Sequence, residues 1–133
     1  MNPPSFFQAS LLVALGGAMG SWLRFAAARL YGASAFPWAT LTVNVAGSFA
    51  MGLLAGWLAR HGPADGMGAG ESWRLLLGIG LLGGFTTFSA FSLDFAVMAE
   101  RGDIGMAAAY VAASLIAGFA GLFAGLALMR SLA

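Results

Sequence analysis

The sequence predicts an all-α membrane protein with four transmembrane helices, the third of them broken. Three observations lead to this fold class. Hydrophobic residues make up 60% of the chain and charged residues only 8%, against roughly 25% charged residues in an ordinary soluble domain. Four apolar segments reach about the 20 residues that a helix needs to cross a hydrocarbon core. The third segment carries glycines and hydroxyl residues close to its middle.

The four expected spans cover residues 6–30, 38–58, 73–97 and 106–129 of a single transmembrane domain, residues 1–133. Gly32 and Pro37 mark the first connection, Gly62 and Pro63 the second, and glycines at 102 and 105 the third; these are turn residues. The opening MNPPSFF lacks the basic region of a signal peptide, so we expect a retained first span. A membrane β-barrel is excluded because its strands alternate apolar and polar residues.

The composition also excludes several classes of function. Six arginines and five acids give a net charge of +1 without a basic patch, so nucleic acid is not an expected partner. With no cysteine and a single histidine, thiolate chemistry and a side-chain zinc cage are excluded. We find no nucleophile and base at catalytic spacing within the spans, and therefore expect that the protein is not an enzyme.

The arginines give no preferred orientation in the membrane. Four spans place both termini on one side with Arg60, Arg74 and Arg130, and they place the other three arginines, at 24, 29 and 101, on the opposite side. Because the positive-inside rule then favours neither orientation, we expect a dual-topology chain that pairs with an inverted copy of itself. The alternative is that loop length or the depth of Arg24 fixes one orientation.

Small and polar residues form stripes on the second and fourth spans. Residues recur every four positions at Thr40, Asn44, Ser48, Gly52 and Gly56, and a similar stripe includes Ala107, Tyr110, Ser114, Gly118, Gly121 and Gly125. Small residues let membrane helices approach closely, which explains the glycines. The amide of Asn44 needs polar partners in hydrocarbon. It either bonds to a neighbouring helix or lines a path for a solute.

The third span combines the twin glycines Gly83 and Gly84 with a hydroxyl and phenylalanine array. Its G-x-G-x-x-G pattern is not a dinucleotide site, because no strand precedes it. We expect one half-helix to end near Gly84 and the other to begin near Thr86, since broken helices in transporters mark ion sites. Free carbonyls suit a cation, and free amides suit an anion. Phe88 and Phe91 share a face, and their ring edges carry partial positive charge.

Three motifs carry a resemblance to a known family. They are GGAMGSWLRF at 16–25, WATLTVNVAGSFAMG at 38–52 and GLLGGFTTFSAFSLD at 80–94. In this order and spacing the chain closely resembles the Fluc/CrcB family of fluoride ion channels. The resemblance implies passive electrodiffusive export of cytoplasmic fluoride across the cell inner membrane. It also implies an inverted homodimer with two fluoride pathways and a structural sodium ion (Na+) at its centre.

The resemblance further assigns roles to single residues. It implies that Phe88 and Phe91 line the fluoride pathway with Asn44 nearby, and that main-chain carbonyls of Gly83 and Thr86 bind sodium in both subunits. The remaining positions that match the polar track or its neighbours are Thr87, Ser89, Tyr110 and Ser114. The chain departs from the family pattern at Ala90, where threonine is frequent, and at Asp94, where glutamate is usual.

Two alternatives to this function stay open at the level of the sequence. A small multidrug-type transporter also has four spans and exchanges protons for organic cations, but it needs a carboxylate buried in the membrane, and the first span has none. A structural subunit of a larger complex would explain only the glycine stripes. Arg24 is either a snorkelled side chain or a vestibule charge that concentrates anions.

Overall fold

The protein is a bundle of long helices, seen in a computed structural model that describes residues 3–61 and 69–132. Four helical stretches are long and apolar enough to cross a membrane: Phe6–Tyr31, Trp38–His61, Gly70–Glu100 and Ile104–Ser131. They correspond to the four predicted spans: the first two begin at the predicted residues, and the other six ends lie one to three residues further out. The chain is a multi-pass membrane protein. The predicted turn at Gly62 and Pro63 lies outside the described residues.

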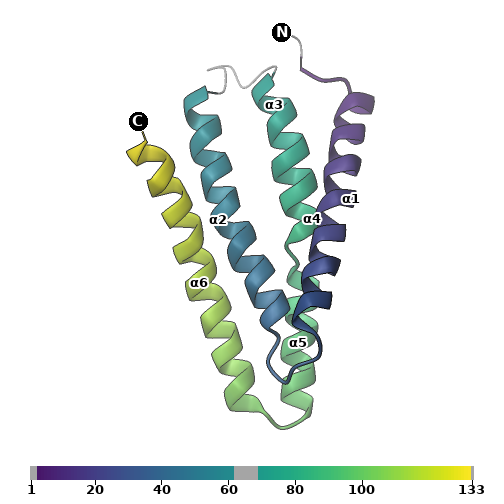
Figure 1. The fold of residues 1–133 in the computed structure, drawn as a ribbon, viewed down its shortest axis with the longest axis vertical. Helices are drawn as coiled ribbons and strands as arrows, with labels where there is room; N and C mark the ends of the chain where they lie inside the picture. Colours follow the sequence, from purple (N-terminus) through teal and green to yellow (C-terminus); the bar gives the residue numbers. More distant parts are fainter. Residues whose placement is uncertain (1–2, 62–68, 133) are drawn as a thin grey trace.

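The first, second and fourth stretches are single helices, α1 (Phe6–Tyr31), α2 (Trp38–His61) and α6 (Ile104–Ser131). The third is assembled from α3 (Ala69–Trp73), the π-helix η1 (Arg74–Leu82), α4 (Gly83–Phe85) and α5 (Phe88–Glu100). α1 begins and α6 ends at the same end of the bundle, where α2 ends and α3 begins (Figure 1). The bundle is therefore built of four antiparallel passes.

Local sequence fixes where these helices begin and end. Ser5 and Gln8 form a capping box at the start of α1, in which the Ser5 hydroxyl accepts from the Gln8 amide at 3.3 Å and the Gln8 side chain accepts from the Ser5 amide at 3.0 Å. Gly32 follows α1 with φ 65° and Gly102 follows α5 with φ 85°. Both values lie in the left-handed region that glycine adopts without strain, so both chain reversals fall at predicted turns.

A close seam joins α1 to the π-helix and α4. A Cβ atom added at Gly16 would overlap the carbonyl oxygen of Leu76, and one added at Gly80 would lie 2.9 Å from the Gly16 Cα. Gly20 likewise packs on the backbone of Leu81. Hydrophobicity gives no drive between helices in lipid, so such backbone contact, which only glycine permits, is what holds these two helices together.

A second seam joins α2 to α6 along the predicted stripes. A Cβ added at Gly52 would overlap the carbonyl oxygen of Leu122, and one added at Gly125 would overlap that of Phe49. Figure 1 shows the two helices running side by side. The glycines of the stripes thus act in helix packing, as predicted. α5 packs on the first half of α6 through a core of Met98, Ala107 and Tyr110.

Candidate functional site

The third span is interrupted by two extended residues, as predicted, but slightly later in the chain than expected. Thr86 has φ −82° and ψ 159°, and Thr87 has φ −153° and ψ 119°. The twin glycines themselves stay helical, whereas we expected the first half-helix to end at them. A Cβ added at Gly84 would lie 2.5 Å from the Gly17 carbonyl oxygen. The second glycine thus serves the contact with α1, and the chain leaves the helix only after Phe85.

Asn44 holds the extended segment from the neighbouring helix α2. Its side-chain Nδ2 donates to the Thr87 carbonyl oxygen at 3.0 Å, and its Oδ1 accepts from the Thr87 amide at 2.7 Å. This paired arrangement satisfies both main-chain polar groups of one residue at a depth where water is scarce. The question that the sequence left open is thereby answered in part: the Asn44 amide bonds to another helix, and one Nδ2 hydrogen remains for a further partner.

Threonine side chains cap the ends of the two half-helices at the break. The Thr86 amide and hydroxyl both donate to the Leu82 carbonyl oxygen, each at 3.0 Å, which ends the first half. The Thr87 hydroxyl accepts from the Ala90 amide at 3.1 Å and lies 3.2 Å from the Ser89 hydroxyl. Thr87 is therefore the N-cap of α5, a role for which threonine is well suited.

The interruption leaves main-chain groups free on both sides. Within residues 3–61 and 69–132, no hydrogen bond reaches the carbonyl oxygens of Gly83 or Thr86, and none leaves the amides of Phe88 or Ser89. These are the carbonyl and amide groups that a helix end leaves without partners. Carbonyl oxygens attract cations and amide hydrogens attract anions, so the break presents both signs of partial charge close together.

An open groove lies beside the break, between α2, α5 and α6. Its volume is about 270 Å³, and the predicted residues that line it are Asn44, Phe88, Phe91 and Ser114. The Phe88 and Phe91 rings have centroids 5.6 Å apart, and Phe88 is 78% exposed. The Ser114 Oγ is buried without a hydrogen-bond partner among the described residues. The groove therefore brings together two phenylalanine rings and the Asn44 amide, with an unpaired hydroxyl just beneath its wall.

Tyr110 lies behind this groove. It is fully buried, its ring packs on Phe91 with a centroid separation of 5.2 Å, and its hydroxyl donates to the Asp94 carboxylate at 3.2 Å. The predicted track residue thus supports the Phe91 ring and lines none of the grooves described here. The pair with Asp94 was not foreseen, because the two residues are 16 positions apart and on different helices.

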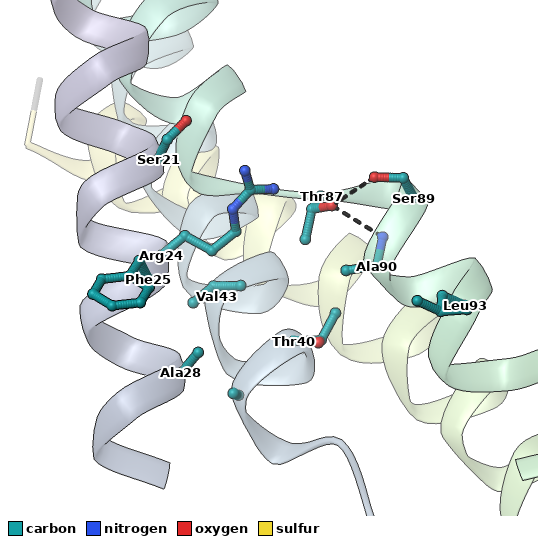
Figure 2. A pocket seen from close by; sticks show the side chains of 11 residues that line it. Ser21, Arg24, Phe25, Ala28, Thr40, Val43, Thr87, Ser89, Ala90 and Leu93 are labelled. Carbon is teal, nitrogen blue, oxygen red and sulfur yellow. Dashed lines mark hydrogen bonds between the residues drawn. The ribbon is translucent and has the colours of Figure 1, made fainter. Parts of the chain in front are cut away.

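A second and larger pocket lies on the other side of the break. Its volume is about 530 Å³, and Arg24, Thr40, Thr87 and Ser89 are among its lining residues. Figure 2 shows the Arg24 side chain extending from α1 toward Thr87 and Ala90. The predicted residues therefore divide into two groups: Thr87 and Ser89 share the pocket of Arg24, whereas the phenylalanines and Ser114 line the groove. Thr87, held by Asn44, is the point where the two groups meet.

Sequence reasoning did not assign Ser48 to the site. This residue lines the groove and also a neighbouring pocket of about 300 Å³ with Asn44 and Thr86. The signal was present, since Ser48 falls four residues after Asn44 on the predicted polar stripe. A serine in a membrane helix commonly bonds its own backbone, so the residue type alone does not mark Ser48 as part of the site.

Comparison with known proteins identifies the family of this chain. Residues 11–126 match the family model described as CrcB-like protein, Camphor Resistance (CrcB). The fluoride-specific ion channel FluC of Novosphingobium aromaticivorans is 55% identical over 130 residues, which cover 94% of this chain and 98% of the relative. FluC of Rhodospirillum centenum is 54% identical over 126 residues (91% and 94%), and FluC of Caulobacter vibrioides is 49% identical over 124 residues (90% and 94%). The chain belongs to the CrcB family.

Proposed function

We propose that the protein is a fluoride-specific ion channel that exports cytoplasmic fluoride by passive electrodiffusion through the cell inner membrane. It is a channel and not an enzyme. The family supports this function, since relatives that are 49–55% identical to this chain are named fluoride-specific ion channels. The observation that carries the proposal at the level of atoms is the extended break, held by Asn44, beside a groove with two phenylalanines and a vacant hydroxyl.

The proposed pathway holds fluoride with neutral groups. Phenylalanine ring edges carry partial positive charge, and the hydroxyl of Ser114 and the remaining Nδ2 hydrogen of Asn44 are donors. Together they replace part of the water shell of a small anion. No arginine lines the groove, so binding there is weak enough for the ion to leave, as conduction requires. Arg24 stands in the pocket beyond the break, where we propose that it raises the local anion concentration.

We propose that the channel is an inverted homodimer. The groove and the neighbouring pocket open to the outside of the single chain, and Phe88 is 78% exposed. A partner that packs across this face would close both and supply the rest of the wall. The balanced distribution of arginines, three at each end, supports insertion in both orientations.

We propose that sodium binds to the main-chain carbonyls of Gly83 and Thr86. Both carbonyls lack a hydrogen-bond donor among the described residues, so both are free to bind a cation. The donor set fits a hard cation, which prefers oxygen ligands. One chain offers too few such oxygens, so the same two residues of a second copy would complete the site. Bound there, sodium would contribute positive charge beside the break.

Fluoride efflux from liposomes tests the function. Purified protein is reconstituted in the presence of sodium gluconate into vesicles loaded with potassium fluoride or potassium chloride, and release is started with a potassium ionophore. We expect fast fluoride release and little chloride release, since the groove matches a small, strongly hydrogen-bonding anion. Equal release of both anions would contradict the proposed selectivity, and release of neither would contradict a channel. Protein-free vesicles serve as the control for leak.

A further inference from the structure

A separate apolar groove lies at the end of the bundle where α2 ends, α3 begins and α6 ends. Its volume is about 440 Å³, within the range of small-molecule sites, and its walls come from three helical segments. The residues that line it are Leu53, Leu54, Trp57, Trp73, Leu77 and Met129. None of them takes part in the break or in the two pockets beside it, so the proposed fluoride pathway does not account for this groove.

Aromatic residues stand where the groove meets the membrane boundary. The Trp57 and Trp73 rings meet edge to face with centroids 6.4 Å apart, and the His61 ring stacks on Trp57 at 5.5 Å. Trp73 is 45% exposed. Tryptophan is enriched at the level of lipid headgroups because one end of its ring system is apolar and the other is polar. The mouth of the groove therefore lies at headgroup depth, with its leucines toward the hydrocarbon.

Positive charge gathers at the same mouth. Arg60 donates from Nη1 to the carbonyl oxygen of Met129, which places its guanidinium over one wall of the groove with other N–H groups left to donate. Arg130 follows directly in the chain. Arg74 is paired with Glu71 at 2.7 Å. In sequence this end carries three arginines and two acids, and guanidinium groups suit the oxygens of a phosphate.

We propose that this groove binds an anionic phospholipid, with one acyl chain against Leu53, Leu54 and Leu77 and the phosphate at Arg60. The chain is already surrounded by lipid, and the apolar walls, the tryptophan edge and the arginine match the three parts of such a molecule in order. A basic residue near an anionic membrane surface strengthens binding by about fivefold. The site would thus prefer an anionic lipid over a zwitterionic one, independently of fluoride conduction.

Tryptophan quenching by brominated lipids tests this site. Trp22 and Trp38, which are 65% and 51% exposed, are replaced by phenylalanine, so that Trp57 and Trp73 remain as reporters. The protein is placed in lipid nanodiscs with a small fraction of phosphatidylglycerol or phosphatidylcholine brominated on the acyl chain. We expect half-maximal quenching by brominated phosphatidylglycerol at a several-fold lower fraction than by brominated phosphatidylcholine.

Variants in the same background separate the site from general lipid contact. Arg60→Gln should weaken the phosphatidylglycerol preference by about fivefold, Arg60→Lys should keep most of it, and Arg29→Gln, at the opposite end of the bundle, should leave it unchanged. Equal quenching by the two lipids would overturn the proposal, because it would indicate ordinary boundary lipid. Absence of quenching would also overturn it, because the groove would then be covered by protein, such as a second copy.

Discussion

Replacing Asn44 tests whether one side chain on α2 keeps the third span open. The Asn44 amide makes both hydrogen bonds to the main chain of Thr87, at 2.7 and 3.0 Å. Asn44→Leu removes both and adds no polar group, whereas Asn44→Asp keeps the acceptor but turns a second carboxylate oxygen toward the Thr87 carbonyl oxygen. Both substitutions leave α2 itself intact, since leucine and aspartate are tolerated in helices.

The expected loss follows from the two hydrogen bonds. A polar group left unsatisfied at a buried site costs about 1–3 kcal/mol, so two groups cost about 2–6 kcal/mol. Because 1.36 kcal/mol corresponds to a factor of ten, Asn44→Leu should reduce the population of the open break by at least about thirtyfold. Asn44→Asp should do at least as much harm, since it sets two oxygens against each other and brings a charge toward mid-membrane.

Fluoride efflux measured with an ion-selective electrode gives the readout. Ser48→Ala is the matched control, because Ser48 lies one turn further along the same face and lines the same groove but makes no hydrogen bond to Thr87. We expect efflux to fall at least about thirtyfold with Asn44→Leu and much less with Ser48→Ala. Normal efflux through Asn44→Asp would refute the reasoning, since the break would then persist without the amide.

Four further predictions concern the groove of Phe88 and Ser114, the contact of α1 with the third span, and the ion. Phe88→Ile should lower fluoride efflux about tenfold, because it keeps apolar bulk but removes a ring edge. Ser114→Ala should lower efflux while thermal stability holds or rises, because the lost hydroxyl has no partner among the described residues. A fall in stability without a fall in efflux would contradict the proposed role of Ser114. Gly20→Val should lower the free energy of unfolding by about 1–3 kcal/mol or more. Gly105→Val, which has open space around it, should leave the free energy of unfolding measured by chemical denaturation nearly unchanged. Similar losses of stability in both variants would contradict the close contact of α1 with the third span. Replacing sodium by potassium in reconstituted vesicles should slow fluoride efflux and weaken dimers measured by cross-linking, and unchanged values would remove Gly83 and Thr86 from an ion site.

The sequence predicted the parts of the fold that depend on composition and periodicity. Apolar length determines where a chain can cross a bilayer, so four spans could be located within a few residues. The glycine stripes predicted close helix packing, and the structure places Gly52 and Gly125 in direct contact with opposing backbone. The interruption of the third span was also predicted, because glycine and threonine clusters favour a change of backbone direction.

What could not be predicted depends on contacts between helices that are distant in sequence. The twin glycines Gly83 and Gly84 indicated the break, yet the second of them packs on Gly17 of α1 and remains helical. Asn44 was recognised as unusual, but its partner, Thr87, is 43 residues away. A nine-residue π-helix ahead of the break has no simple sequence signature, since π-helices are rare and arise at functional sites.

The contact of α1 with the π-helix has a consequence for what this membrane protein keeps out. A methyl group cannot be placed at Gly16 or Gly20 without overlapping opposing backbone, so there is no room for a file of water molecules between these glycines and residues 76–85 of the third span. Protons and hydrated cations, which travel along such files, therefore find the first half of the third span insulated on its α1 side. Beyond this contact the space beside α1 widens into the pocket of Arg24 at the break, and discrimination among ions has to be enforced there and in the groove of Phe88.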